Sequence, residues 1–185
     1  MKPLALLLTM LSVALLACGG GDGDGGPGAQ DRGPSGQAPQ TTTVDACALV
    51  TRAEAEALLG SAVADTQKGP VGPFQSCGYY SSAGVFDFVQ VQACRCLGGN
   101  QFDASARAGG EALGVTVKPV AGVGDKAYWL NGILWVQKGP YAVNLWISTA
   151  ALTREGGQAL QGEALERKAL PKHIEVAQRV LARLP

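Results

Sequence analysis

The chain has 185 residues, with 15 basic side chains, 15 acidic side chains and one histidine. No run of Lys or Arg is longer than Arg167-Lys168, so the basic footprint of a nucleic-acid-binding protein is absent. The near-neutral charge also argues against electrostatic steering toward anionic lipids or polyanionic substrates.

The N-terminal stretch predicts an export signal. Lys2 precedes an uncharged apolar segment, residues 3–17, which is shorter than the about 20 residues that cross a bilayer. Its last residues and Cys18 read Leu-Leu-Ala-Cys, and this motif resembles the lipobox of bacterial lipoproteins. The resemblance implies that residues 1–17 are a signal peptide and that Cys18 carries the lipid. It also implies a cell-envelope location, on the outer face of the plasma membrane or on the outer membrane.

Residues 18–44 predict a lipidated cysteine followed by a flexible tether. Positions 19–43 contain nine glycines, three prolines and no apolar residue larger than Ala, so ordering them would cost more than they could gain. Such a Gly-rich segment spans roughly 25 to 30 Å. Asp22 and Asp24 lack the further oxygen ligands of a calcium loop, so we expect no metal there. The remaining residues, 45–185, fit one domain.

The first element of this domain is a helix over residues 52–59. Thr51 and Glu54 have the spacing of a capping box, and Gly60 stands where a helix C-cap favours positive φ.

The elements that follow predict a sheet with helices packed on it. Residues 76–81 and 85–94 are expected to form a tight hairpin, 99–112 a helix and 115–120 a strand. Three strands then form a meander over 126–130, 133–137 and 141–149, joined first by an Asn-Gly turn. Pro171 is expected to start the last helix. This order indicates an α+β domain on an antiparallel sheet of about five to six strands.

Three segments resemble uncharacterised domain families of bacterial, notably actinobacterial, surface lipoproteins. They are the opening from Asp45 to Gly60, the Cys77-Gly-Tyr79 strand and the segment from Val120 to Trp129. The resemblance implies an envelope lipoprotein, and it brings no known activity.

The meander contains the candidate binding surface. The Asn-Gly turn pairs Trp129 with Leu134, and a three-residue turn at 138–140 would pair Trp135 with Val143. One face then carries mostly aliphatic side chains and forms the core. The second face presents the candidate binding residues Trp129, Leu134, Val136 and Trp146. Two interpretations stay open: a helix covers this second face, or it forms an aromatic groove for an apolar ligand, a glycan or a partner protein.

Four cysteines remain in the domain. A tight hairpin would place Cys77 opposite residue 88 and far from Cys94, which favours a disulfide between Cys47 and Cys77. Cys94 and Cys96 could form a local disulfide or a redox or soft-metal pair. They lack the further ligands of a zinc site.

Evidence for catalysis in the sequence is sparse. His173 is expected to be a solvated or capping imidazole in the last helix. The letters of a dinucleotide fingerprint at 122–127 are followed by a predicted strand instead of a helix, so no cofactor is expected. We therefore predict a noncatalytic binding or interaction module, anchored to the membrane by its lipid, with an envelope protein or an apolar or glycan ligand as its partner. The alternative is an envelope enzyme, either hydrolytic or redox-active at Cys94 and Cys96.

Overall fold

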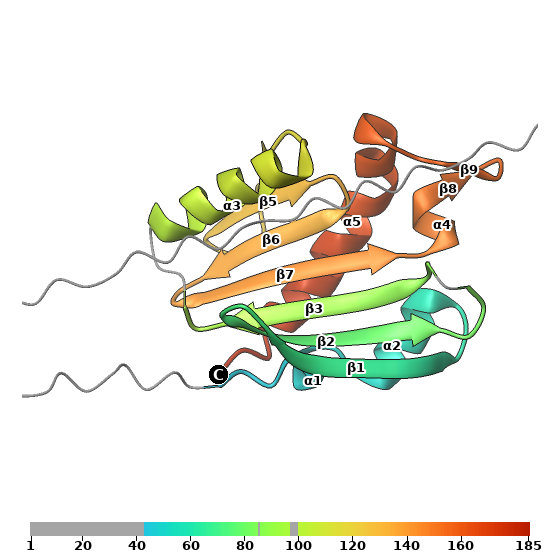
Figure 1. The fold of residues 1–185 in the computed structure, drawn as a ribbon, viewed down its shortest axis with the longest axis horizontal. Coiled ribbons are helices and arrows are strands. Elements are labelled where there is room, and N and C mark those ends of the chain that lie inside the picture. The colour runs from blue at the N-terminus through green and yellow to red at the C-terminus, as the bar shows by residue number, and fades with distance from the viewer. Residues whose placement is uncertain (1–42, 85, 97–99) are drawn as a thin grey trace, which may run out of the picture. The chain divides into compact units, whose positions relative to one another are not determined.

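The computed structural model describes residues 43–84, 86–96 and 100–185. The predicted signal peptide, the lipidation site Cys18 and the tether up to residue 42 lie outside them and stay predictions. The described part is an antiparallel seven-stranded sheet with helices on its faces (Figure 1), so the predicted α+β class is confirmed.

The strands of the large sheet lie in the order β1-β2-β3-β7-β6-β5-β4. Their bounds are β1 Val63–Val71, β2 Phe74–Ser81, β3 Phe88–Cys94, β4 Lys118–Pro119, β5 Lys126–Leu130, β6 Ile133–Lys138 and β7 Tyr141–Ser148. The helices are α1 Ala46–Leu49, α2 Arg52–Leu59, α3 Asn100–Leu113, α4 Ala150–Thr153 and α5 Gly162–Leu181. A small second sheet consists of β8 Arg154–Glu155 and β9 Gln158–Ala159.

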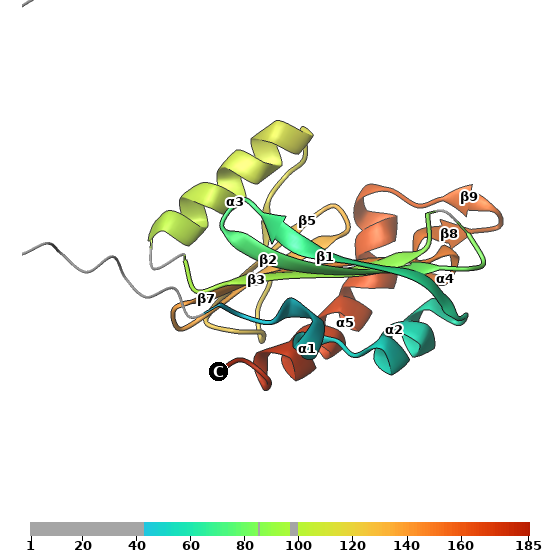
Figure 2. The same ribbon diagram turned by 60° about the horizontal axis from the view of Figure 1, so that its bottom comes forward.

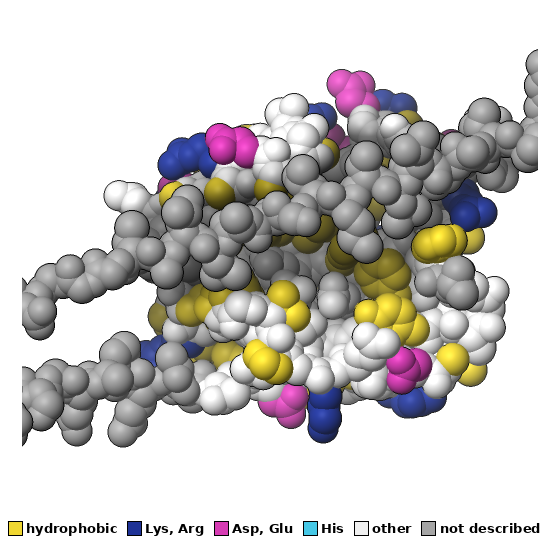
Figure 3. Space-filling view, viewed as in Figure 1, with side chains coloured by type: hydrophobic (Ala, Val, Ile, Leu, Met, Phe, Trp, Pro, Cys, Tyr) yellow, Lys and Arg dark blue, Asp and Glu magenta, His cyan; other side chains and the backbone are white. Residues whose placement is uncertain are grey.

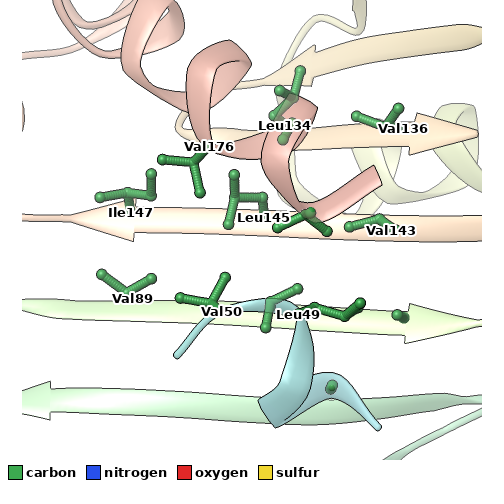
Figure 4. Close-up of a cluster of buried hydrophobic side chains, with 14 of the residues drawn as sticks. Leu49, Val50, Val89, Leu134, Val136, Val143, Leu145, Ile147 and Val176 are labelled. Atoms are coloured by element: carbon green, nitrogen blue, oxygen red, sulfur yellow. The ribbon is translucent and has the colours of Figure 1, made fainter. Parts of the chain in front are cut away.

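Helices α1, α2 and α5 lie on one face of the sheet (Figure 2), which we call the covered face. Alternate side chains of the strands point toward these helices and are almost fully buried. Figure 4 shows this core between the sheet, α1 and α5, with Val89, Leu134, Val136, Val143, Leu145 and Ile147 from the strands. Burial of this apolar surface is the main stabilising contribution to the domain.

The N-terminal segment is fastened to β2 at several points. The predicted capping box of α2 is present, since Thr51 and Glu54 bond each other's backbone, and Gly60 ends the helix at φ 67°. Cys47 is bonded to Cys77, with their α-carbons 5.1 Å apart, in the pairing that the sequence favoured. The Tyr79 hydroxyl donates to the Val50 carbonyl at 2.6 Å. The Cys-Gly-Tyr segment therefore has a structural role here.

The hairpin of β2 and β3 differs from the prediction. Cys77 lies opposite Val91 instead of residue 88, because the connecting loop is longer than a tight turn. Residue Asp87 stabilises this loop: its backbone carbonyl accepts from the Ser81 N–H, and its carboxylate accepts from the Ala150 N–H at the start of α4.

The predicted register of β7 is wrong by one residue. The turn between β6 and β7 has two central residues, since Lys138 pairs with Tyr141, so Trp135 lies opposite Asn144 and not Val143. Asp125 stabilises this turn by accepting the Gly139 N–H at 2.6 Å. A one-residue shift moves every side chain of a strand to the other face.

Three further elements differ from the sequence-based predictions. Helix α5 begins at Gly162 and contains Pro171 in its interior, because Leu165 and Ala169 extend its buried stripe and outweigh the about 3 kcal/mol cost of a helical proline. The expected strand over 115–120 is reduced to β4. Strand β1 was not predicted, and as a largely exposed edge strand it lacks the apolar alternation that identifies a half-buried strand.

Candidate ligand-binding face

The second face of the sheet is covered only in part. In the part of the chain that the structure describes, α3 is the helix on this side, over β5 and β6 (Figures 1 and 2). Phe102 of α3 stacks on Tyr128 with ring centroids 5.8 Å apart, and Asp103 accepts from the Tyr128 hydroxyl at 3.0 Å and from Lys126 at 2.7 Å. The bond from Lys126, more than any other interaction, holds the pKa of Asp103 below its ordinary value.

Two glycines let α3 approach closely. A Cβ at Gly109 would come within 3.1 Å of the Trp135 ring, and one at Gly110 would overlap Val117 at 2.3 Å. Gly109 therefore allows the ring of Trp135 to lie directly against α3, and Gly110 allows Val117 to do the same.

The middle of this side, which we call the open face, carries aromatic and amide side chains. It consists of Tyr80, Phe88, Gln90, Gln92, Ile133, Trp135, Asn144 and Trp146. None of these is Lys, Arg, His, Asp or Glu, and where this side is visible in Figure 3, hydrophobic and uncharged side chains occupy the middle and charged ones lie toward the edges. The open face is therefore suited to an uncharged ligand.

An aromatic row crosses the open face. The Tyr80 and Phe88 rings are 5.9 Å apart, and Phe88 meets Trp146 edge-on at 4.8 Å. Trp146 is 40 % exposed, which is unusual for so large an apolar side chain. Gly78 leaves space that the Tyr80 ring occupies, since a Cβ there would meet that ring at 3.1 Å.

A polar row lies beside the aromatic one. Asn144 of β7 stands between Gln92 of β3 and Trp135 of β6. Its amide Nδ2 donates to Gln92 Oε1 at 3.4 Å, and Gln90 donates to the Ser76 hydroxyl at 3.2 Å. These amides are thus held in place by their neighbours.

Two polar atoms of this row have no hydrogen-bond partner. Among the described residues, the buried side-chain atoms in this state are Trp135 Nε1, a donor, and Asn144 Oδ1, an acceptor. Asn144 is only 8 % exposed, and a buried polar group without a partner costs about 1 to 3 kcal/mol. A cavity of about 140 Å³ lies against both residues and against Gln90, Gln92, Ile133 and Trp146.

The four predicted surface residues do not share one face. Trp129, Leu134 and Val136 lie on the covered face, where Trp129 is 2 % exposed, whereas Trp146 lies on the open face. Helices cover the face that carries Trp129, Leu134 and Val136, as one of the two interpretations of the sequence expected. The wrong prediction comes from the assumed register of β7. The same register left Trp135 out of the candidate surface, whereas a two-residue turn would have paired Trp135 with Asn144.

His173 is buried, so the expectation of a solvated imidazole is wrong. Nε2 accepts the Ile147 N–H at 3.1 Å, and Nδ1 lies 2.9 Å from the Ala169 carbonyl, to which it donates. Burial lowers the pKa of His173 from 6.5 to about 4, against the smaller opposing effect of the hydrogen bond to the Ala169 carbonyl. The ring also meets Trp129 edge-on at 5.0 Å. It is a neutral part of the core.

Cys94 and Cys96 are bonded to each other, with α-carbons 5.2 Å apart. Cys94 is buried beside Phe102 and Ala142, near the start of α3 and outside the cavity of the open face. This is the local disulfide that the sequence left as one of two possibilities.

A larger cavity, of about 260 Å³, lies between β4, β5 and the start of α5. Its charged side chains are already paired: Lys118 with Glu166 at 2.6 Å, and Glu163 with Arg167 at 3.8 Å. The open face is the better candidate because its polar atoms include two without partners.

Comparison of the chain with protein-family models, with curated proteins and with solved structures finds no match. The resemblance to envelope lipoproteins therefore stays a prediction. Within the described ranges, no helix has the length and apolar character needed to cross a membrane.

Proposed function

We propose that the protein is a lipid-anchored lipoprotein of the bacterial cell envelope whose domain is a noncatalytic binding module, with its ligand on the open face. One observation supports the binding role: an aromatic row that ends in the exposed ring of Trp146 lies beside a buried donor and a buried acceptor that lack partners. A ligand that offers both kinds of hydrogen bond relieves this cost on binding.

The placement of the histidine supports binding over catalysis. His173 is committed to two backbone groups in the core and lies on the face opposite the cavity, so it is not placed to act on a ligand there. General acid–base chemistry requires a titratable group within hydrogen-bond reach of the substrate. The side chains that line the cavity are amides, Ile and Trp, which position a ligand without exchanging protons.

The lipid anchor rests on the lipobox-like motif that ends at Cys18. The test is the partition of full-length protein between detergent and aqueous phases, for the parent and for Cys18→Ser. We expect the parent in the detergent phase and the variant in the aqueous phase. Equal partition of the processed forms would contradict the anchor.

The binding role is tested with the full-length parent protein immobilised and exposed to a solubilised envelope extract. Trp146→Ala removes the exposed ring of the open face, and Leu113→Ala is a matched control because Leu113 is also exposed, at 56 %, and does not line the cavity. We expect the parent and Leu113→Ala to retain the same material and Trp146→Ala to lose most of it. Equal retention by all three would reject the open face as the binding site.

A further inference from the structure

We propose that the ligand of the open face is a neutral saccharide, an inference that rests on the binding role proposed above and names its ligand class. The carrying observation is that Trp135 and Asn144, whose Nε1 and Oδ1 atoms have no hydrogen-bond partner, line one cavity together with the exposed ring of Trp146.

The two atoms without partners call for opposite hydrogen-bonding groups. Trp135 Nε1 donates only, and Asn144 Oδ1 accepts only. A hydroxyl group supplies one donor and two acceptor positions, so hydroxyls satisfy both atoms, whereas a purely aliphatic ligand leaves both unsatisfied. The ligand therefore carries hydroxyls close together.

The aromatic row requires that the ligand also has an apolar surface. Trp146 presents an exposed ring that Phe88 supports edge-on at 4.8 Å. A sugar ring has an apolar C–H surface that packs on such a ring, with its hydroxyls directed outward at the edge, where the amides stand. Amphipathic recognition of this kind needs an apolar platform bordered by polar groups, and the open face has both.

Charge excludes the ionic alternatives. The side chains that line the cavity include no Lys, Arg, Asp or Glu, so a phosphate, carboxylate or ammonium group would lose its hydration without gaining a counter-ion there. The cavity volume of about 140 Å³ equals about five water volumes at ~30 Å³ each, which suits one sugar ring and not a folded peptide. Further rings of an oligosaccharide would lie over the exposed part of the aromatic row.

The experiment is a titration of full-length protein, held in a detergent without a sugar headgroup, with cellohexaose, maltohexaose and the fully N-acetylated chitohexaose. Binding is followed by calorimetry and by tryptophan fluorescence. We expect saturable binding of at least one of these neutral hexasaccharides and a fluorescence change that Trp146→Ala removes.

Two variants separate recognition from folding. Asn144→Leu removes the acceptor while keeping the side-chain volume, so we expect it to weaken saccharide binding at least tenfold, ~1.4 kcal/mol, while the melting temperature without saccharide rises. Leu113→Ala is expected to bind like the parent. Unchanged affinity in Asn144→Leu would overturn the proposed recognition.

The saccharide inference and the binding role can fail separately. If no hexasaccharide binds at millimolar concentration while envelope material is retained in a Trp146-dependent manner and is destroyed by protease, the saccharide inference is wrong and the binding role stands. If retention does not depend on Trp146 either, both are wrong.

Discussion

The two faces of one sheet have opposite character in this protein. On the covered face, three helices enclose aliphatic side chains, and the buried polar group there, His173, uses both ring nitrogens for backbone hydrogen bonds. On the open face, amides and aromatic rings alternate with the same strands' core residues, and two buried polar atoms have no partner. Since the same strands supply both faces, β propensity does not account for the contrast.

The contrast supports a division of roles, in which the covered face stabilises the domain and the open face serves the proposed recognition. A sequence shaped only for stability would place apolar side chains at positions 144 and 135 or satisfy their polar atoms, as the covered face does. Residues that lower stability locally are typical of functional sites.

The largest effect is expected from Trp129→Ala, the tryptophan of the covered face. The ring is buried against His173, so its truncation leaves a cavity and should lower the free energy of unfolding by about 3 to 5 kcal/mol. Denaturant unfolding of the full-length protein measures it. A loss as small as that of an ordinary surface substitution would contradict the core position of Trp129.

The two disulfides provide the next test. Cys47 and Cys77 are separated by 30 residues, so replacing both with Ser should cost roughly 3 to 4 kcal/mol in the chain-entropy model. Cys94 and Cys96 are only two residues apart, and the same replacement there should cost less than about 2 kcal/mol. Unfolding of the two double variants side by side decides the order, and the reverse order would contradict it.

Local signals in the sequence predicted much of the covered face. The capping box at Thr51 and Glu54, the stop at Gly60 and the Asn-Gly turn each depend on a few neighbouring residues, and the structure confirms all three. The Cys47 to Cys77 pairing was also predicted, although the hairpin register used for it was wrong.

The open face could not be predicted in the same way. Its composition depends on the turn between β6 and β7, and the interaction that favours the two-residue form is a hydrogen bond from Gly139 to Asp125, 14 residues away in sequence. A difference of one residue in the length of that turn would move Trp146 to the covered face and its neighbours in β7 to the open face. Likewise, nothing local marks Gly109 as the contact for Trp135, because that contact joins α3 to β6.

The pH dependence of stability tests the satisfied polar group of the covered face. The folded pKa of His173 is about 4, below its ordinary 6.5, so the unfolded chain binds the proton more readily. Stability from this group is full above pH 6.5 and is lost as pH falls toward 4, by about 3 kcal/mol in total. Unfolding measured at intervals over this range should show the loss.

His173→Gln is the control for this effect. Gln can still accept the Ile147 N–H but does not titrate, so the decline between pH 6.5 and 5 should largely disappear in the variant. Carboxylates contribute below this window, since Glu54 has a pKa lowered to about 2, chiefly by its hydrogen bond with Arg183. Equal decline in parent and variant would assign the pH dependence to other groups.

The smallest effects are expected on the open face, and for Asn144 the sign is reversed. Asn144→Leu removes a buried acceptor without a partner and should raise the free energy of unfolding by about 1 kcal/mol. Trp146→Ala should change it by less than about 1 kcal/mol, because the ring is 40 % exposed. Denaturant unfolding without ligand measures both, beside Trp129→Ala as the covered-face reference. If Asn144→Leu or Trp146→Ala destabilised the protein as much as Trp129→Ala does, the open face would be a second core, and the separation of stability from recognition would fail.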